Sequence, residues 1–193
     1  MEWATTSTIL ASLADFRNQS AWGRFATQFR EPIVRFALRL GLSASAAEDV
    51  AQETLLAFAE AFRQGRYDRE RGRLRDWLFG IASRQIANRR RADARRRGKE
   101  RDERSAFWHN TVDPEVATTA WESEWTRAVL AACLLRVRQE VEPMTMRAFD
   151  AVVREGRPVA AAARDLHLSV KAVYNARYTV LRRIRELRAE FEL

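Results

Sequence analysis

Residues 158–184 read PVAAAARDLHLSVKAVYNARYTVLRRI, and this stretch decides the fold of the C-terminal part of the chain. Pro158 suits the start of a helix, because its fixed φ is already close to the helical value. Small residues follow it, and Ser169 is a good N-cap for a second helix. His167–Ser169 would then be a tight turn. These features together predict a helix-turn-helix over residues 158–179.

The second helix of this pair is predicted to have one buried and one exposed face. Four apolar side chains are expected in the core: Val170, Val173, Val180 and Ile184. Four others, at helical spacing, are expected to point outward: Lys171, Tyr174, Asn175 and Tyr178. Donors and aromatic rings of this kind suit base edges and phosphates in a major groove, with Arg182 and Arg183 further along. An ordinary helical hairpin with a solvated face is the alternative.

The N-terminal half also shows the periodicity of amphipathic helices. Three helices are predicted there: 22–40, 45–62 and 74–91. Pro32 should break or bend the first of them, and Gly41 should close it. Ser45 and Glu48 have the spacing of a capping box at the start of the second. The third ends in the run Arg89–Arg91.

Residues 92–118 lose the apolar period and are predicted to form a linker. A helical pattern returns near Trp121 and stops at Gly156. The sequence contains no alternating strand pattern and no internal repeat. We therefore predict an all-α fold with two small helical domains joined by a linker, the C-terminal one a helix-turn-helix. The predicted domains are 1–98 and 119–193, with the linker at 99–118.

The charge of the chain points to a polyanionic partner. The formal net charge is +8, and it is concentrated in two blocks. Residues 63–104 carry a net charge of +9 and residues 151–193 a net charge of +4, whereas the segments before and between them are acidic. Nearly all of the positive charge is arginine, whose fork suits phosphates and guanine edges. A GC-rich genome would also favour arginine, but it does not explain the clustering.

Arginines alternate with aromatic residues in the loop and helix between Arg63 and Arg97. Loops of this kind can hold an unpaired base by stacking, while arginine follows the backbone. Trp77, however, lies on the apolar stripe of the helix, which favours a place in the core. The arginine run from Arg89 could by itself be a solvated helix end.

The sequence gives little support to an enzyme. His109 and His167 lie far apart, and no HExxH, CxxC or glycine-rich phosphate loop is present. Cys133 lies in an apolar run, which favours the core, and a single cysteine cannot form an internal disulfide. No catalytic residue, metal, cofactor or small-molecule substrate is expected. Without a secretion signal or an apolar stretch of membrane length, the chain is expected to be cytoplasmic.

Four motifs in this order resemble the sigma-70-like extracytoplasmic-function (ECF) sigma factors, which have regions 2 and 4 only. Residues 47–53 (AEDVAQE), 67–72 (YDRERG) and 77–82 (WLFGIA) are similar to region 2. Residues 168–184 are similar to region 4. The resemblance covers roughly residues 20–100 and 120–190.

The resemblance implies an alternative sigma factor that binds bacterial core RNA polymerase and directs promoter recognition, DNA opening and transcription initiation. The implied contacts to core polymerase are Asp49, Gln52 and Glu53. The implied contacts to the minus-ten element are Arg66, Tyr67, Arg71, Arg73, Arg84, Asn88 and Arg91. The implied contacts to the minus-35 element are Lys171, Tyr174, Asn175, Tyr178, Arg182 and Arg183.

Further partners follow from the same resemblance. Promoter DNA is expected, and an anti-sigma factor is common in the family. The alternative is a stand-alone helix-turn-helix regulator that binds operator DNA as a dimer without core polymerase. Two separated basic blocks and an acidic docking face favour the sigma factor.

Overall fold

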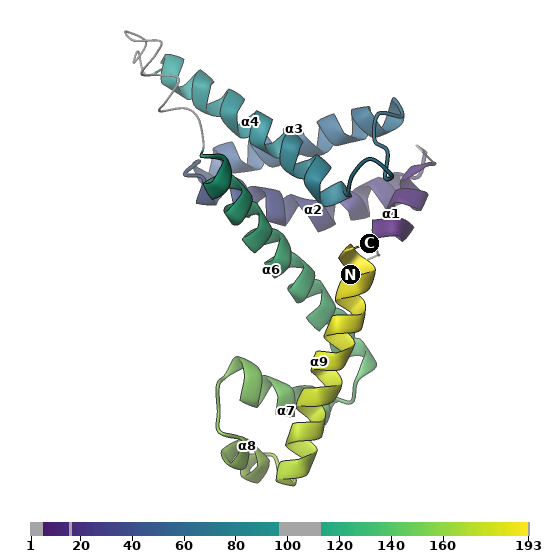
Figure 1. Ribbon diagram of the computed structural model, residues 1–193, viewed down its shortest axis with the longest axis vertical. Helices are drawn as coiled ribbons and strands as arrows, with labels where there is room; N and C mark the ends of the chain where they lie inside the picture. The colour runs from purple at the N-terminus through teal and green to yellow at the C-terminus, as the bar shows by residue number, and fades with distance from the viewer. Residues whose placement is uncertain (1–5, 16, 97–112, 193) are drawn as a thin grey trace. The chain divides into compact units, whose positions relative to one another are not determined.

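The computed structural model describes residues 6–15, 17–96 and 113–192, and all regular structure within them is helical (Figure 1). The predicted all-α fold is therefore confirmed. The helices of the N-terminal half are α1 (Thr6–Leu13), α2 (Gln19–Arg39), α3 (Ala44–Arg63) and α4 (Leu74–Arg96). Those that follow are α6 (Pro114–Glu140), α7 (Pro143–Phe149), η1 (Asp150–Arg154), α8 (Val159–Asp165) and α9 (Val170–Glu192).

The chain divides into two compact units, Ser7–Ala128 and a unit that contains Val129–Leu193. The division falls inside α6. The second domain was predicted at 119–193, with a linker at 99–118. Residues 92–96 are helical in α4, and α6 begins at Pro114, so both flanks of the predicted linker are helices. Residues 97–112 of that linker lie outside the described residues.

Helices α2, α3 and α4 pack on one another in the N-terminal unit (Figure 1). Their core contains aromatic rings spaced along α2 that meet aliphatic and aromatic side chains of the other two helices. The largest fully buried members include Phe25, Phe29, Ile33, Phe36, Phe58, Leu74, Leu78 and Ile86. The apolar stripes predicted for these three helices are thus the buried faces.

Helix α2 is continuous through Pro32, so of the two predicted alternatives, a break or a bend, the break into two helices is wrong. Pro32 is buried, and its neighbours Phe29 and Ile33 lie in the core. Proline removes a helical hydrogen bond, but packing on both sides offsets that loss. The end of the helix was predicted correctly, because Gly41 follows it with a φ of +83°.

The N-cap of α3 is Ser43 rather than Ser45. The Ser43 side chain accepts a hydrogen bond from the backbone N–H of Ala46 at 3.3 Å. Ser45 therefore lies within the first turn, and the predicted capping box from Ser45 to Glu48 is wrong. Both serines can cap a helix. Ser43 is the one that does so in the arrangement in which Ala46 and Ala47 face the core, where both are buried.

The C-terminal unit is built around α9, which packs against α7 and α8. The turn between α8 and α9 contains His167, whose φ is +53°. Leu168 N–H donates to Ala163 O at 2.8 Å, which closes the end of α8. Ser169 Oγ accepts from Ala172 N–H at 3.1 Å, as its predicted role as N-cap requires.

Candidate nucleic-acid interfaces

The outward face of α9 is the first candidate interface. Lys171, Tyr174, Asn175 and Tyr178 are all exposed, and the two tyrosines are 52% and 63% exposed. The opposite face is buried through Val173, Ala176, Val180 and Ile184. Val170 departs from the prediction, because it is 47% exposed at the first turn of the helix. Exposed tyrosine rings leave apolar surface in contact with water, which is unfavourable. A face of this kind is therefore typical of a binding surface.

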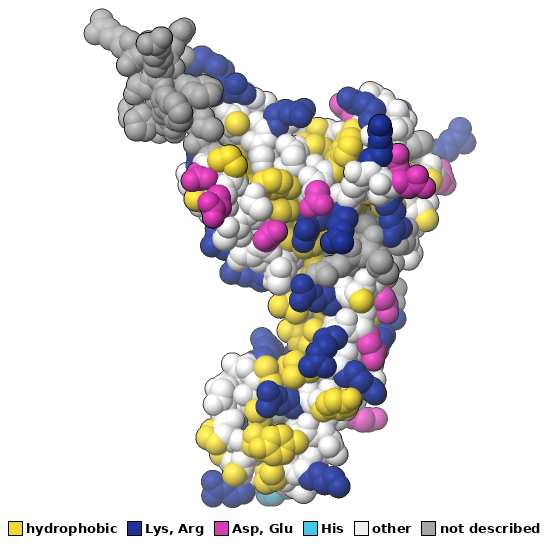
Figure 2. All heavy atoms as spheres, viewed as in Figure 1, with side chains coloured by type: hydrophobic (Ala, Val, Ile, Leu, Met, Phe, Trp, Pro, Cys, Tyr) yellow, Lys and Arg dark blue, Asp and Glu magenta, His cyan; other side chains and the backbone are white. Residues whose placement is uncertain are grey.

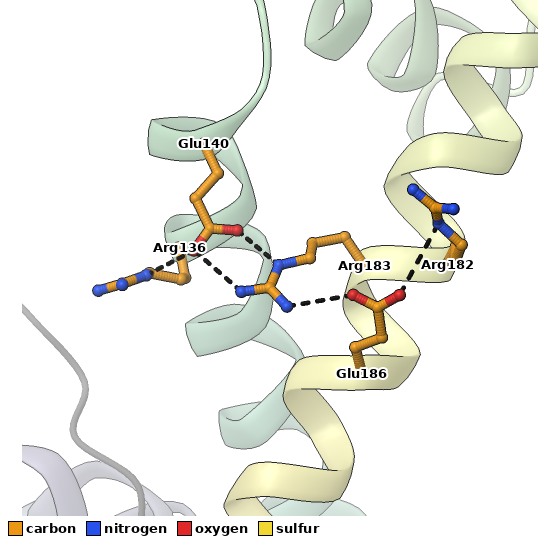
Figure 3. A network of polar contacts seen from close by, with 5 residues as sticks. All are labelled: Arg136, Glu140, Arg182, Arg183 and Glu186. Carbon is orange, nitrogen blue, oxygen red and sulfur yellow. Dashed lines mark hydrogen bonds and ion pairs between the residues drawn. The ribbon is translucent and has the colours of Figure 1, made fainter.

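Arg182 and Arg183, which follow on α9, have different surroundings (Figure 3). The guanidinium of Arg182 lies over the Tyr178 ring, 5.9 Å from its centroid, and its side chain is 59% exposed. Arg182 Nε lies 3.7 Å from Glu186 Oε1. Arg183 is bound more closely, by two carboxylates. Its Nε donates to Glu140 Oε2 at 2.6 Å, and its Nη1 donates to Glu186 Oε2 at 3.1 Å.

This carboxylate network shifts the protonation equilibria at the end of α6. Hydrogen bonds from Arg183 and then from Arg136 lower the pKa of Glu140 to about 2. The same hydrogen bond to Glu140, followed by the one to Glu186, raises the pKa of Arg183. Arg183 was predicted to contact a phosphate. In this structure its guanidinium already has two anionic partners. Glu186 lies one turn along the same helix, whereas Glu140 is 43 positions away, so no local sequence pattern indicates it.

The loop between α3 and α4 and the outer face of α4 form the second candidate interface. Arg66, Arg71 and Arg73 are exposed in the loop, and Arg84, Asn88 and Arg91 are exposed on α4. Asn88 Oδ1 accepts a hydrogen bond from Arg91 Nη2 at 2.6 Å, so these two side chains act as a pair. Figure 2 shows how Lys and Arg side chains are spread over the visible face of the protein.

Tyr67 differs from the other predicted minus-ten contacts, because it is partly buried in an aromatic cluster. Its ring lies 5.8 Å from Phe58, 6.1 Å from Phe62 and 5.5 Å from Trp77. Burial raises the pKa of its hydroxyl. The cluster holds the start of the loop against α3. The sequence-based alternative, that the aromatic residues of this segment are structural, fits Tyr67 as well as Trp77.

Other arginines of α4 are tied to the N-terminal unit itself. Arg90 donates to the backbone carbonyl of Leu40, and burial lowers its pKa. Arg89 Nη1 donates to Asp49 Oδ2 at 2.9 Å, and its Nε lies 3.6 Å from Asp93 Oδ1. The run Arg89–Arg91 therefore contains two kinds of arginine: some join α4 to other parts of the domain, and others are exposed to solvent. The helical period of the sequence does not distinguish the two kinds.

The predicted polymerase-docking residues lie on α3. Gln52 and Glu53 are exposed. Leu56, about one turn further along the same helix, is also exposed, at 58%. Asp49, whose side chain is 48% exposed, is the one bound by Arg89. The face is thus available at two of its three predicted positions, and the third is held by an ion pair within the domain.

The described residues hold no group of three or more His, Cys, Asp or Glu side chains that could bind a metal ion. Among the same residues, no helix is both long and apolar enough to cross a membrane. Cys133 is buried, as predicted for a core cysteine.

Comparison with known proteins identifies the N-terminal unit. Residues 25–96 match the family Sigma-70 region 2. The chain is also similar to the ECF RNA polymerase sigma factor RpoE of Cereibacter sphaeroides, at 23% identity over 141 residues, which cover 73% of this chain and 74% of that protein. These two similarities confirm the resemblance to ECF sigma factors that the sequence motifs predicted. Both matches support a role as a sigma factor in transcription initiation.

Proposed function

We propose that this protein is an alternative sigma factor that binds core RNA polymerase and directs it to promoters. Catalysis belongs to the polymerase, and the sigma factor supplies recognition and DNA opening. The single observation that carries the proposal is a sigma-70 region 2 match over residues 25–96 in a chain that also exposes the donor and aromatic face of α9.

Region 2 would make two contacts. Exposed polar side chains of α3, above all Gln52 and Glu53, would bind core polymerase. The loop after α3 and the outer face of α4 would bind the minus-ten element, where Arg84 and Arg91 are exposed next to Asn88. Arginine can follow an unpaired strand while an aromatic ring stacks on a base. Tyr67 is only partly buried, so part of this side chain remains accessible to a base.

The C-terminal unit would read the minus-35 element as duplex. Helix α8, the turn at His167 and the longer α9 have the order of a helix-turn-helix, in which the second helix enters the major groove. Lys171 and Asn175 lie near the N-terminal end of α9, which enters the groove first in such motifs. Arg182 is exposed further along, where a phosphate contact is expected.

The deciding experiment is in vitro transcription with bacterial core polymerase and a library of random promoters. The proposal expects initiation only when the protein is present, from templates enriched in two separated motifs. Initiation that does not depend on the protein would refute it. So would tight binding of a symmetrical duplex operator without core polymerase, which would favour the stand-alone regulator.

A further inference from the structure

The turn that joins α8 to α9 contains a residue in a backbone conformation that side chains rarely adopt (Figure 1). His167 has a φ of +53°, and in the described part of the chain it is the only residue other than glycine with a positive φ. This left-handed conformation brings the Cβ atom of an L-residue close to the following carbonyl oxygen. Glycine has no Cβ atom and adopts the conformation freely. His167 therefore occupies a position that favours glycine.

Three other helices in the described residues end in the same conformation, and each of them uses glycine there. These residues are Gly41 after α2, Gly65 after α3 and Gly156 after η1, with φ values of +83°, +65° and +70°. At the ends of α2, α3 and α8, the residue that follows donates its backbone N–H to the carbonyl oxygen five positions earlier, at 2.8–3.2 Å. The closure of α8 thus has the same hydrogen bond as closures made with glycine, and the fold does not require a histidine at this turn.

No contact within the protein offsets the strain at His167. Its side chain is exposed, so burial does not stabilise it. The imidazole also has no hydrogen-bond or ion-pair partner among the described residues. Strained residues of this kind gather where a protein binds a ligand. The side chain is therefore available to a molecule outside the chain.

The charges around the turn favour an anionic ligand. Arg164 on α8 and Lys171 on α9 lie on either side of His167 in the sequence, and both are exposed. The acidic residue of the same turn, Asp165, forms an ion pair with Arg157, which neutralises its charge. An imidazole carries at least one N–H donor in either protonation state. The turn therefore presents a hydrogen-bond donor between two cations.

We propose that the His167 imidazole donates a hydrogen bond to a backbone phosphate of the duplex that α9 reads. This inference rests on the proposed function, because duplex reading by α9 is part of it. A phosphate contact carries no sequence information, but it fixes how a helix lies on the duplex. His167 is thus a positioning residue, which sets the N-terminal end of α9 against the base edges.

Thermal unfolding of the full chain tests the strain without any assumption about function. His167→Gly should raise the Tm of the C-terminal unit by about 4 °C, because the left-handed conformation no longer crowds a Cβ atom. The matched variant is Gly156→His in the same unit, where a Cβ atom would meet nothing within 4 Å and only the φ of +70° is unfavourable. It should lower the Tm by a similar amount. A Tm that falls in His167→Gly would overturn the proposal.

Binding of a labelled promoter duplex tests the phosphate contact. Holoenzymes are formed with the wild-type chain, His167→Ala or His167→Gly, and their affinities are compared by fluorescence anisotropy. Both variants should bind about three- to tenfold more weakly, because one hydrogen bond is lost. His167→Ala keeps the Cβ atom and the strained turn, so a loss shared by both variants comes from the imidazole. Unchanged affinity in both, or a loss in His167→Gly alone, would overturn the proposal.

Promoter selection separates a phosphate contact from a base contact. The minus-35 motif selected by the His167→Ala holoenzyme should match that of the wild-type chain, and a changed motif would overturn the phosphate assignment. If the wild-type chain supports no initiation, the proposed function itself fails. Binding of duplex DNA by the full chain alone then decides the contact. A weaker affinity in both His167 variants would support it, and equal affinities or no binding by the wild-type chain would overturn it.

Discussion

Arg183 and Arg182 are neighbours on α9, and we expect the first to be structural and the second to bind DNA. Replacing each of them by alanine tests this difference. Arg183 is bound by Glu140 and Glu186 at 2.6–3.2 Å, whereas Arg182 lies 3.7 Å from Glu186 (Figure 3). Arg182 is also more exposed, and its guanidinium lies over the Tyr178 ring. A phosphate could bind Arg183 only by competing with two carboxylates. We therefore expect Arg183→Ala to lower the stability of the C-terminal unit, and Arg182→Ala to lower affinity for DNA.

The expected magnitude follows from the geometry of Arg183. Its three hydrogen bonds to Glu140 and Glu186 span 2.6–3.2 Å, and charge-assisted bonds contribute about 1.5–3 kcal/mol when desolvated. The side chain is 32% exposed, and that of Glu140 26%, so solvent screens the interaction. A net contribution of about 1 kcal/mol remains, which corresponds to a Tm shift of about 4–8 °C in a domain of this size.

The assay combines thermal unfolding with duplex binding by fluorescence anisotropy across a salt series. Arg182→Ala should leave the Tm unchanged, weaken binding to all sequences alike and reduce the salt slope by about 1. Arg183→Ala should lower the Tm and leave the salt slope near that of the wild-type chain. The reasoning is refuted if Arg183→Ala reduces the salt slope as much as Arg182→Ala while the Tm is unchanged.

Acid provides a second way to break the same network. The pKa of Glu140 is lowered from 4.5 to about 2, so the carboxylate binds fewer protons in the folded state than in the unfolded one. Its contribution to stability is therefore complete above about pH 4.5 and is lost as the pH falls toward 2. Between pH 6 and pH 3, the Tm should fall less for Glu140→Gln than for the wild-type chain. Parallel curves would contradict the assignment.

Three further variants test the other surfaces. Gln52→Ala combined with Glu53→Arg should weaken binding to core polymerase with unchanged far-UV circular dichroism, and wild-type affinity would refute the docking assignment. Asn175→Ala should change the preferred minus-35 bases, since a base-edge contact contributes about 1–3 kcal/mol of discrimination, and an unchanged motif in a promoter-library selection would refute it. Tyr67→Ala should destabilise the region 2 domain by about 2 kcal/mol, because a half-buried ring is lost, and an unchanged urea midpoint would show that the ring has no structural role.

Local signals predicted the C-terminal fold well. The turn at His167, the cap at Ser169 and the two faces of α9 depend on residues close together in the sequence, and the structure has each of them. Val170 was predicted to be buried, but it is 47% exposed at the N-terminal end of α9. Periodicity predicts a face but not how far along a helix the covering elements extend.

The mistakes in the N-terminal half arose where packing decided between local alternatives. Pro32 can break a helix in isolation, and Ser45 can cap one, but buried neighbours overrule both tendencies. The helical pattern that returns near Trp121 was predicted to belong to the C-terminal domain alone. In the structure the helix serves two cores, so Trp121 is buried in one unit, Val129 in the other, and Leu135 is 42% exposed.

The same limit applies to the candidate sites. Sequence spacing found exposed donors on α9 and arginines around the loop, because exposure follows from the helical period. It did not find that Glu140 binds Arg183 or that Arg89 binds Asp49, since each pair joins different helices. Long-range ion pairs carry no local pattern, and they decide which arginines are available to DNA.

The position of Trp121 and Trp125 also has a consequence for biosynthesis. Helices α2, α3 and α4 leave the ribosome first, but their aromatic surface is completed only when α6 has emerged as far as Ala128. Domains commonly fold in order as they are synthesised. A nascent chain that ends at Arg96 therefore presents an uncovered patch around Phe29 and Phe36, to which chaperones can bind, and one that ends at Ala128 does not.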